Sequence, residues 1–329
     1  MSRALDKDVV ASLQTGDPLA AYKAISEVLT WSKSNDGLDE IEILRRNERF
    51  QDGTYVLRDG LAVGVIKVGL VQAFLVARKM LAAHLDGTTP RASDELFATT
   101  GVILLMDPEY LTAANTRKRL IQSQLYDKDV LVREKHFVDS LLTSRLHRHT
   151  KSPTLWSHRR WLLQKFALQD IPLDVLADLT SVVFVAGERH PRNYYAWCHA
   201  RLLAGLRSGD SGQGILAAVK NWCFQHHTDI SGWSFLSFLL NIGASPDKSA
   251  CSLTLAEVLS LAESLRLTNE SVWVFLRTLV ASGLVGDEDY RRFLHASQDL
   301  MDSSSHEIDK RVLNSARDWS NTYRVKAKE

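Results

Sequence analysis

Apolar residues recur every three to four positions along most of this chain, and short polar breaks separate the apolar stretches. This spacing places apolar side chains on one face of an α-helix, whereas a half-buried strand alternates apolar and polar positions. We therefore predict an all-α fold over most of the chain. The predicted helices span residues 64–85, 92–106, 110–123, 130–147, 153–168, 172–189, 192–207, 213–227, 230–242, 252–266, 270–283, 287–301 and 305–322.

The first 60 residues are less regular. Residues 6–31 predict one or two helices with a break at Gly16-Asp17-Pro18, and residues 32–60 are polar and irregular. Within them, Asp59-Gly60 stands between two short apolar runs, which is typical of the turn of a β-hairpin. We expect a small hairpin here that is peripheral to the helical fold.

A tryptophan recurs at nearly constant spacing in the second half of the chain. The intervals between successive copies are 41, 36 and 40 residues. Four residues before each tryptophan stands a residue type that often caps a helix N-terminus, and six residues after it stands a leucine. The tryptophans are Trp156, Trp197, Trp233 and Trp273, their predicted caps are Ser152, Asn193, Asp229 and Asn269, and a weaker copy has Ala114 in the tryptophan position.

One such interval has room for two helices and two loops, so the unit is a helical hairpin that repeats. The sequence predicts an α-α superhelix, a solenoid of stacked hairpins, in which each tryptophan is buried between neighbouring repeats. The residue four positions after each tryptophan lies on the same helical face. We expect its guanidinium to stack on the indole or to bond a nearby carbonyl where it is an arginine, at Arg160, Arg201 and Arg277.

Two segments, 151–163 and 191–203, are more specific than this pattern. They resemble the repeats of protein prenyltransferase alpha subunits, whose signature is Asn-Tyr-x-x-Trp-x-x-Arg-Arg. The matching positions are Trp156, Arg159 and Arg160 in one segment and Asn193, Tyr194, Trp197 and Arg201 in the other. Ala200, Leu236 and Leu276 replace the first arginine in the later copies, so this chain is divergent.

The resemblance implies a crescent-shaped, non-catalytic alpha-type subunit of a heterodimeric protein prenyltransferase of the geranylgeranyltransferase type. It implies a partner beta subunit, of the kind found in Rab geranylgeranyltransferase, that holds the catalytic zinc, and an isoprenoid diphosphate and acceptor protein bound by the heterodimer. No cofactor, metal or catalytic residue is expected in this chain.

The resemblance also implies two residues close to the substrates. In the family, a lysine before Asn-Tyr reaches the isoprenoid diphosphate, and the tyrosine lies beside the acceptor site. The matching positions are Arg192 and Tyr194. The alternative for Arg192 is a local packing role, and for Asn193 we favour simple helix capping.

The resemblance covers residues 97–280 and suggests three regions. Residues 1–90 are expected to form a helical and irregular extension, residues 91–285 the repeats, and residues 286–329 capping helices.

Composition and charge narrow the classes of function. Hydrophobic residues make up 45% of the 329 residues and the formal net charge is +1, which is ordinary globular composition and favours no nucleic-acid partner. Three cysteines without a CxxC pair and a polar N-terminus predict a cytoplasmic protein with reduced thiols. The apolar stretch 61–77 contains Lys67 and Gln72, so we expect a buried helix and no membrane span.

Residues 133–165 are locally basic, with eight basic and two acidic residues. A solvated face, an interface with an acidic beta subunit, a phosphate site and an RNA site all remain open. The competing function for the whole chain is an α-solenoid scaffold without a transferase link. The repeat interval exceeds the 34 residues of tetratricopeptide arrays and so argues against that family.

Overall fold

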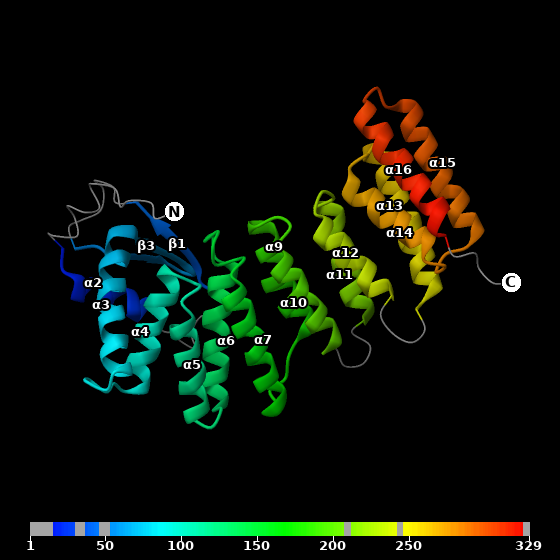
Figure 1. Cartoon of the computed structure of the whole chain (residues 1–329). Helices are drawn as coiled ribbons and strands as arrows, with labels where there is room; N and C mark the ends of the chain where they lie inside the picture. Colours follow the sequence, from blue (N-terminus) through cyan, green and yellow to red (C-terminus); the bar gives the residue numbers. More distant parts are fainter. Residues whose placement is uncertain (1–15, 30–36, 46–52, 207–211, 242–245, 325–329) are drawn as a thin grey trace. The chain divides into compact units, whose positions relative to one another are not determined.

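The computed structural model describes residues 16–29, 37–45, 53–206, 212–241 and 246–324, and most of them are helical (Figure 1). The helices that contain the tryptophan motifs begin at or within a few residues of their predicted starts. The helices are α2 (Pro18–Val28), α3 (Lys67–Leu85), α4 (Ser93–Met106), α5 (Leu111–Ser123), α6 (Lys128–Thr143), α7 (Pro153–Leu168), α8 (Val175–Asp178), η1 (Leu179–Phe184), α9 (Val185–Arg189), α10 (Tyr194–Gly205), α11 (Gly212–Gln225), α12 (Ile230–Asn241), α13 (Lys248–Leu265), α14 (Glu270–Ala281), α15 (Asp287–Ser303) and α16 (Glu307–Tyr323).

The mostly helical character is therefore confirmed. The segment predicted as one helix over 172–189 is helical but irregular, because η1 is a π-helical stretch between α8 and α9. The helix expected before Gly16 lies outside the described residues.

The structure has a three-stranded sheet near the N-terminal end of the described chain. Its strands are β1 (Glu40–Leu44), β2 (Val56–Asp59) and β3 (Ala62–Ile66). Strands β2 and β3 are antiparallel and pair Asp59 with Ala62, so the predicted hairpin is confirmed. Gly60 has φ of +58°, a conformation that favours glycine. The helix predicted from residue 64 begins only at Lys67 because β3 continues to Ile66.

Strand β1 was not predicted. It runs parallel to β3, and its backbone is also held by α6. The Asp39 and Ile41 amides donate to the hydroxyl oxygens of Ser140 and Ser144, at 3.1 and 3.2 Å. The sheet is thereby fixed to the helices.

Helix α3 is long and apolar enough to cross a membrane by length and composition alone, and 39% of its most apolar window is buried. It packs against α2 and α4. Within the described residues it is the one helix that passes this test.

The chain divides into two compact units. The first comprises Met1–Asp174 with Val185–His190, and the second comprises Val175–Phe184 with Pro191–Glu329. In the first unit, α4 packs on α3 and α5, and α7 packs on α5 and α6. The regions expected from the resemblance, with limits near residues 90 and 285, stay a prediction.

In the second unit the helices alternate between two layers. Helices α10, α12, α14 and α16 pack successively on one another, and α11, α13 and α15 do the same. Each helical hairpin thus stacks on the next within this unit, as the repeat interval predicts. The crescent shape and the superhelix of the whole chain stay predictions.

All four repeat tryptophans are buried, with exposed fractions of 4% or less, which confirms the expected packing. In three of them the indole Nε1–H donates to the backbone carbonyl six residues upstream, because a buried polar group needs a partner. Trp156 donates to Thr150, Trp233 to His227 and Trp273 to Leu267, at 2.8–2.9 Å.

Between repeats of the second unit, two of the tryptophans meet a ring from the next copy of the motif. Trp197 lies 5.6 Å from Phe235 and Trp233 lies 5.1 Å from Phe275, measured between ring centroids. Each phenylalanine stands two residues after the following tryptophan. Gly232 permits close approach, because a Cβ atom there would lie 2.5 Å from the Trp222 ring.

In the first unit, charged side chains take part in the core. Arg159 is fully buried, and its Nε–H donates to an oxygen of Asp139 at 2.7 Å. Lys135 donates to the other carboxylate oxygen at 2.8 Å. Burial of Asp139 opposes ionisation, but Arg159 and Lys135 outweigh it and hold the pKa of Asp139 below its ordinary value. Arg159 is therefore part of the core of the first unit.

Removal of one partner of the Asp139–Arg159 ion pair should lower the stability of the fold. We expect Asp139→Leu to lower the free energy of unfolding by about 3 kcal/mol or more, because the buried Arg159 charge loses its carboxylate. The double variant Asp139→Leu/Arg159→Met should recover most of that loss, since an apolar pair replaces a buried ion pair at little cost. Chemical denaturation of both variants measures this, and a double variant as unstable as the single one would contradict it.

Buried histidine should make stability depend on pH. His149 is 4% exposed and its Nε2 bonds the Leu104 carbonyl at 3.0 Å. Burial lowers the pKa of His149 to about 4 although that hydrogen bond opposes the shift. The unfolded chain, with a pKa near 6.5, therefore binds this proton more readily, so the stabilisation present above pH 6.5 is lost as the pH falls towards 4.

We expect His149→Gln to reduce the loss of unfolding free energy between pH 7 and pH 4.5 by about 2 kcal/mol, because glutamine does not titrate. Denaturation at the two pH values measures this loss. An unchanged dependence in His149→Gln would contradict the assignment.

Candidate functional site

The segment before α10 is the substrate-proximal site that the resemblance implies. Asn193 is buried and caps α10, accepting a hydrogen bond from the Ala196 amide at 3.2 Å. Arg192 has φ of +60°, which is uncommon for a residue with a Cβ atom. Its backbone amide donates to Oδ2 of Asp229 at 2.6 Å. The conformation of Arg192 is thereby fixed by the next repeat.

Asp229 links the starts of two helices. Its other oxygen, Oδ1, accepts from the amides of Ser231 and Gly232 at 2.9 and 3.0 Å and so caps α12. One buried carboxylate thus holds the turn at Arg192 and the first turn of α12. The cap at Asp229 is predictable from its residue type, but its bond to Arg192 is not.

The side chains at this turn are presented to solvent. Arg192 is exposed, and Tyr194 is 69% exposed. The rings of Tyr194 and Tyr195 meet edge to face with centroids 5.7 Å apart. A hydrogen bond with Cys198, one turn along α10, raises the pKa of the Tyr194 hydroxyl, which therefore stays protonated at neutral pH. The segment offers a cation and a neutral phenol that an external molecule can reach.

The predicted caps are confirmed at three of the four motifs. Ser152 accepts from the Leu155 amide at 3.1 Å, as Asn193 and Asp229 do for their helices. The prediction that the Asn269 side chain caps its helix is wrong. Asn269 stands at the N-terminus of α14 without a capping bond, and its amide instead donates to the His227 carbonyl at 2.8 Å.

The arginines four residues after the tryptophans have three different environments. Arg201 donates to the Trp197 carbonyl at 3.2 Å and to Ser234 at 2.9 Å, and it lies over the Phe238 ring. Arg277 lies 5.0 Å from the Trp319 ring. Arg160 is exposed. The carbonyl bond is thus confirmed for Arg201, but both contacted rings belong to neighbouring elements, not to the indole of the same motif.

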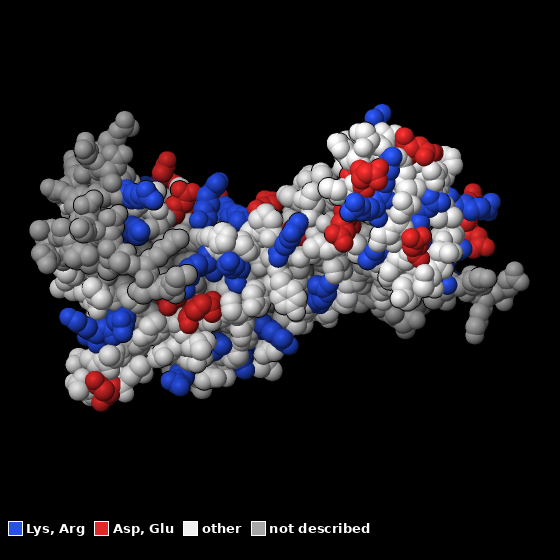
Figure 2. Space-filling model, turned by 45° about the horizontal axis from the view of Figure 1, so that its top comes forward, with Lys and Arg blue, Asp and Glu red and all other residues white. Residues whose placement is uncertain are grey.

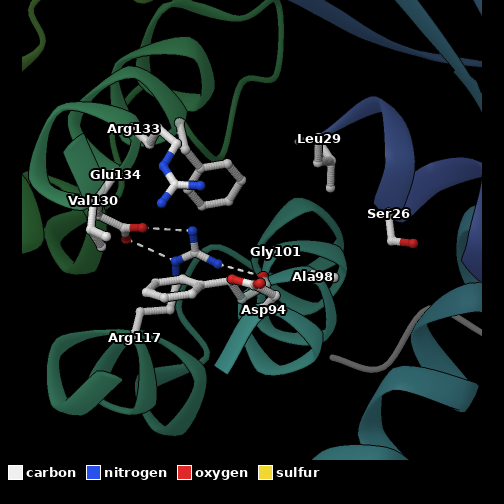
Figure 3. Close-up of a pocket in the computed structure, with 11 residues that line it drawn as sticks. Ser26, Leu29, Asp94, Ala98, Gly101, Arg117, Val130, Arg133 and Glu134 are labelled. Carbon is white, nitrogen blue, oxygen red and sulfur yellow. Dashed lines mark hydrogen bonds and ion pairs between the residues drawn. The ribbon is translucent and has the colours of Figure 1, made fainter. Parts of the chain in front are cut away.

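A pocket of about 300 Å³ lies in the first unit, between α2, α4, α5 and α6 (Figure 3). Arg117 at its base donates to both carboxylate oxygens of Glu134, at 2.8 and 2.6 Å, and to the Phe97 carbonyl at 2.6 Å. Its guanidinium also lies 4.2 Å from the Phe137 ring.

Arg117 and Glu134 thus form a buried ion pair with two hydrogen bonds. Burial opposes ionisation of Glu134, but Arg117 and His158 hold the pKa of that carboxyl below its ordinary value. The arrangement joins α5 to α6 inside the first unit. The sequence pattern missed the pair, since Arg117 and Glu134 stand on different helices.

No group of three or more potential metal ligands lies together among the residues that the structure describes. The rings of His147 and His190 meet edge to face at 4.4 Å. A neighbouring His149 is engaged with the Leu104 carbonyl. These histidines contribute to packing.

Residues 139–166 match the protein prenyltransferase alpha subunit repeat, and residues 155–265 match the ECM9 middle domain. Helix α7, with Trp156 and Arg159, lies almost wholly within both matches. Both matches thus fall on the part of the chain in which the tryptophan motifs are strongest.

Three relatives each match 45% of this chain. Protein prenyltransferase alpha subunit repeat-containing protein 1-B of Xenopus laevis is 31% identical over 168 residues, and its Homo sapiens counterpart, repeat-containing protein 1, is 32% identical over 167. Protein ECM9 of Saccharomyces cerevisiae is 30% identical over 156 residues. The matches cover 37%, 40% and 41% of those proteins, so the chain spans about two fifths of their length.

The resemblance inferred from the tryptophan motifs is therefore confirmed. The chain carries a repeat of the protein prenyltransferase alpha subunit family and is similar to protein prenyltransferase alpha subunit repeat-containing protein 1.

Proposed function

We propose that this chain is the alpha-type, non-catalytic subunit of a heterodimeric protein geranylgeranyltransferase. The observation that carries the proposal is the similarity to alpha subunit repeat proteins, which includes the repeat match over residues 139–166. In this proposal the heterodimer is cytoplasmic, and a beta subunit of the Rab geranylgeranyltransferase type holds the catalytic zinc, activates the cysteine thiolate of the acceptor protein and binds the isoprenoid in an apolar tunnel.

The turn before α10 supports a role near the substrates. Arg192 and Tyr194 are exposed, while the residues that hold the turn, Asn193 and Asp229, are buried. A rigid support beneath exposed functional groups reduces the conformational freedom that they lose on binding. The guanidinium has a planar fork of donors suited to phosphate oxygens, so Arg192 can take the place of the family's lysine.

Mixing the purified chain with a beta subunit tests the proposal against the scaffold alternative. We expect a 1:1 complex on size-exclusion chromatography and transfer of the isoprenoid to an acceptor cysteine only when both chains are present. The beta subunit alone is the control. Transfer by this chain alone, or the absence of any complex, would contradict the proposal, and the second outcome would favour a scaffold.

Within the reconstituted heterodimer, we expect Arg192→Ala to slow the single-turnover transfer step at least about tenfold, or roughly 1.4 kcal/mol, because positive charge near the departing diphosphate is lost. Arg192→Lys should keep most of the rate. The rate is measured by rapid quench with radiolabelled isoprenoid diphosphate.

The Arg192→Gly variant separates the effect of the side-chain charge from that of the backbone conformation. Glycine adopts positive φ without strain, so this variant should be at least as stable as the original chain in thermal unfolding, yet it should be as slow as Arg192→Ala. Heterodimer assembly should be intact in all three variants. A normal transfer rate in Arg192→Gly would show that the side chain does not act on the diphosphate.

A further inference from the structure

Two lysines and two aromatic rings form a cluster on the first unit. Lys118 comes from α5, Tyr126 from the turn that follows it, and Trp161 and Lys165 from α7. The ammonium groups of Lys118 and Lys165 lie 5.8 and 5.6 Å from the Trp161 ring centroid, and Lys165 lies 4.9 Å from that of Tyr126. We call these four residues the lysine–tryptophan cluster.

The two ammonium groups have ring contacts but no carboxylate beside them. Among the described residues, neither lysine forms a hydrogen bond or an ion pair with an acidic side chain. Lys118 is half-buried, and loss of solvent lowers its pKa. An ammonium group that has already lost part of its hydration gains more from an incoming anion than a fully solvated one does.

Exposed apolar side chains flank the cluster. Leu125, which immediately precedes Tyr126, is 84% exposed, and Leu168, one turn beyond Lys165 on α7, is 68% exposed. Leu125 and Tyr126 both have positive φ, 52° and 59°. Residues with a Cβ atom adopt this conformation at a cost, and here it sets the tyrosine ring beside Lys165 and leaves the leucine in solvent.

We propose that the lysine–tryptophan cluster is a docking surface for an acidic segment of a partner protein, in which glutamate or aspartate side chains pair with the two lysines and an apolar side chain packs on the flanking leucines. This inference is independent of the proposed transferase role. Two of the four residues of the cluster, Trp161 and Lys165, belong to the basic segment 133–165.

Figure 2 shows one face of the molecule, on which basic and acidic side chains intermingle over the C-terminal helices. The nearby carboxylate of Asp127 is engaged, since it caps α6 by accepting from the Val130 amide at 3.0 Å.

The observations favour a peptide over a nucleic acid. Bases bind proteins by stacking on an open aromatic face, but the Trp161 ring already contacts two ammonium groups, His158 at 5.9 Å and Tyr126 at 6.5 Å. The exposed leucines offer apolar contacts that a phosphate backbone does not use. Carboxylate pairing with an apolar anchor suits both features.

Binding of a defined probe to the full chain tests the inference. The probe is a fluorescein-labelled peptide of glutamates with two leucines, Gly-Glu-Glu-Leu-Glu-Glu-Leu-Gly, and fluorescence anisotropy gives its dissociation constant. We expect saturable binding that weakens as salt rises. An analogue with lysine in place of each glutamate, and an eight-nucleotide uridine oligomer, are the comparison ligands.

Matched double variants identify the site. Lys118→Gln/Lys165→Gln should weaken binding of the peptide at least tenfold. Arg119→Gln/Arg160→Gln removes the same charge from exposed positions on the same two helices and should change binding less than twofold. Thermal unfolding of both variants checks that the fold is kept.

Three outcomes would overturn the inference: no saturable binding of the acidic peptide, equal losses in the two double variants, or tighter binding of the uridine oligomer than of the peptide. Equal losses would indicate a general basic surface, and preference for the oligomer would indicate a nucleic-acid site. None of these outcomes bears on complex formation with a beta subunit, so the two proposals fail separately.

Discussion

The indole N–H of a buried tryptophan must find an acceptor, and this requirement organises the repeats. Trp156, Trp233 and Trp273 all find it in the carbonyl six residues upstream. The bond ties the loop before each helix to the core that the tryptophan fills. Trp197 is the exception, because its buried Nε1 has no such bond within the described residues, and its preceding turn is the one with Arg192 at positive φ.

The position three residues after each tryptophan explains how the motif can diverge. Arg159 occupies it in the first unit, and Ala200, Leu236 and Leu276 occupy it in the second; all four are fully buried. In the first unit the position is charged and paired with Asp139. In the second unit an apolar residue fills the same place. Since an apolar residue can replace a buried ion pair at little cost, loss of the arginine does not imply loss of the repeat.

Local sequence accounts for much of this structure. The helices follow from apolar periodicity, and the caps Ser152, Asn193 and Asp229 follow from residue type and spacing. What depends on distant partners was not predictable. The parallel pairing of β1 with β3, the Arg117–Glu134 pair and the bond from Asp229 to Arg192 each join residues from different elements, and periodicity within one element holds no information on them. Asn269 does not cap α14, because its side-chain amide donates to the His227 carbonyl in the loop between α11 and α12.

For the turn before α10, the resemblance implies which residues lie near the substrates, Arg192 and Tyr194, but holds no information on their conformation. The structure adds that a carboxylate from the next repeat holds the turn. The lysine–tryptophan cluster had a weaker signal, since Lys118 and Lys165 stand 47 positions apart. Their shared contact with Trp161 exists only once α5 and α7 pack together.

The six-residue link between indole and carbonyl also bears on how such arrays change in length during evolution. The intervals between successive tryptophans differ, at 41, 36 and 40 residues, yet the stretch from acceptor to indole is the same in the three repeats that have the bond. Insertions and deletions upstream of the acceptor carbonyl are thus compatible with the fold. A residue added between the acceptor and the indole would instead break the hydrogen bond.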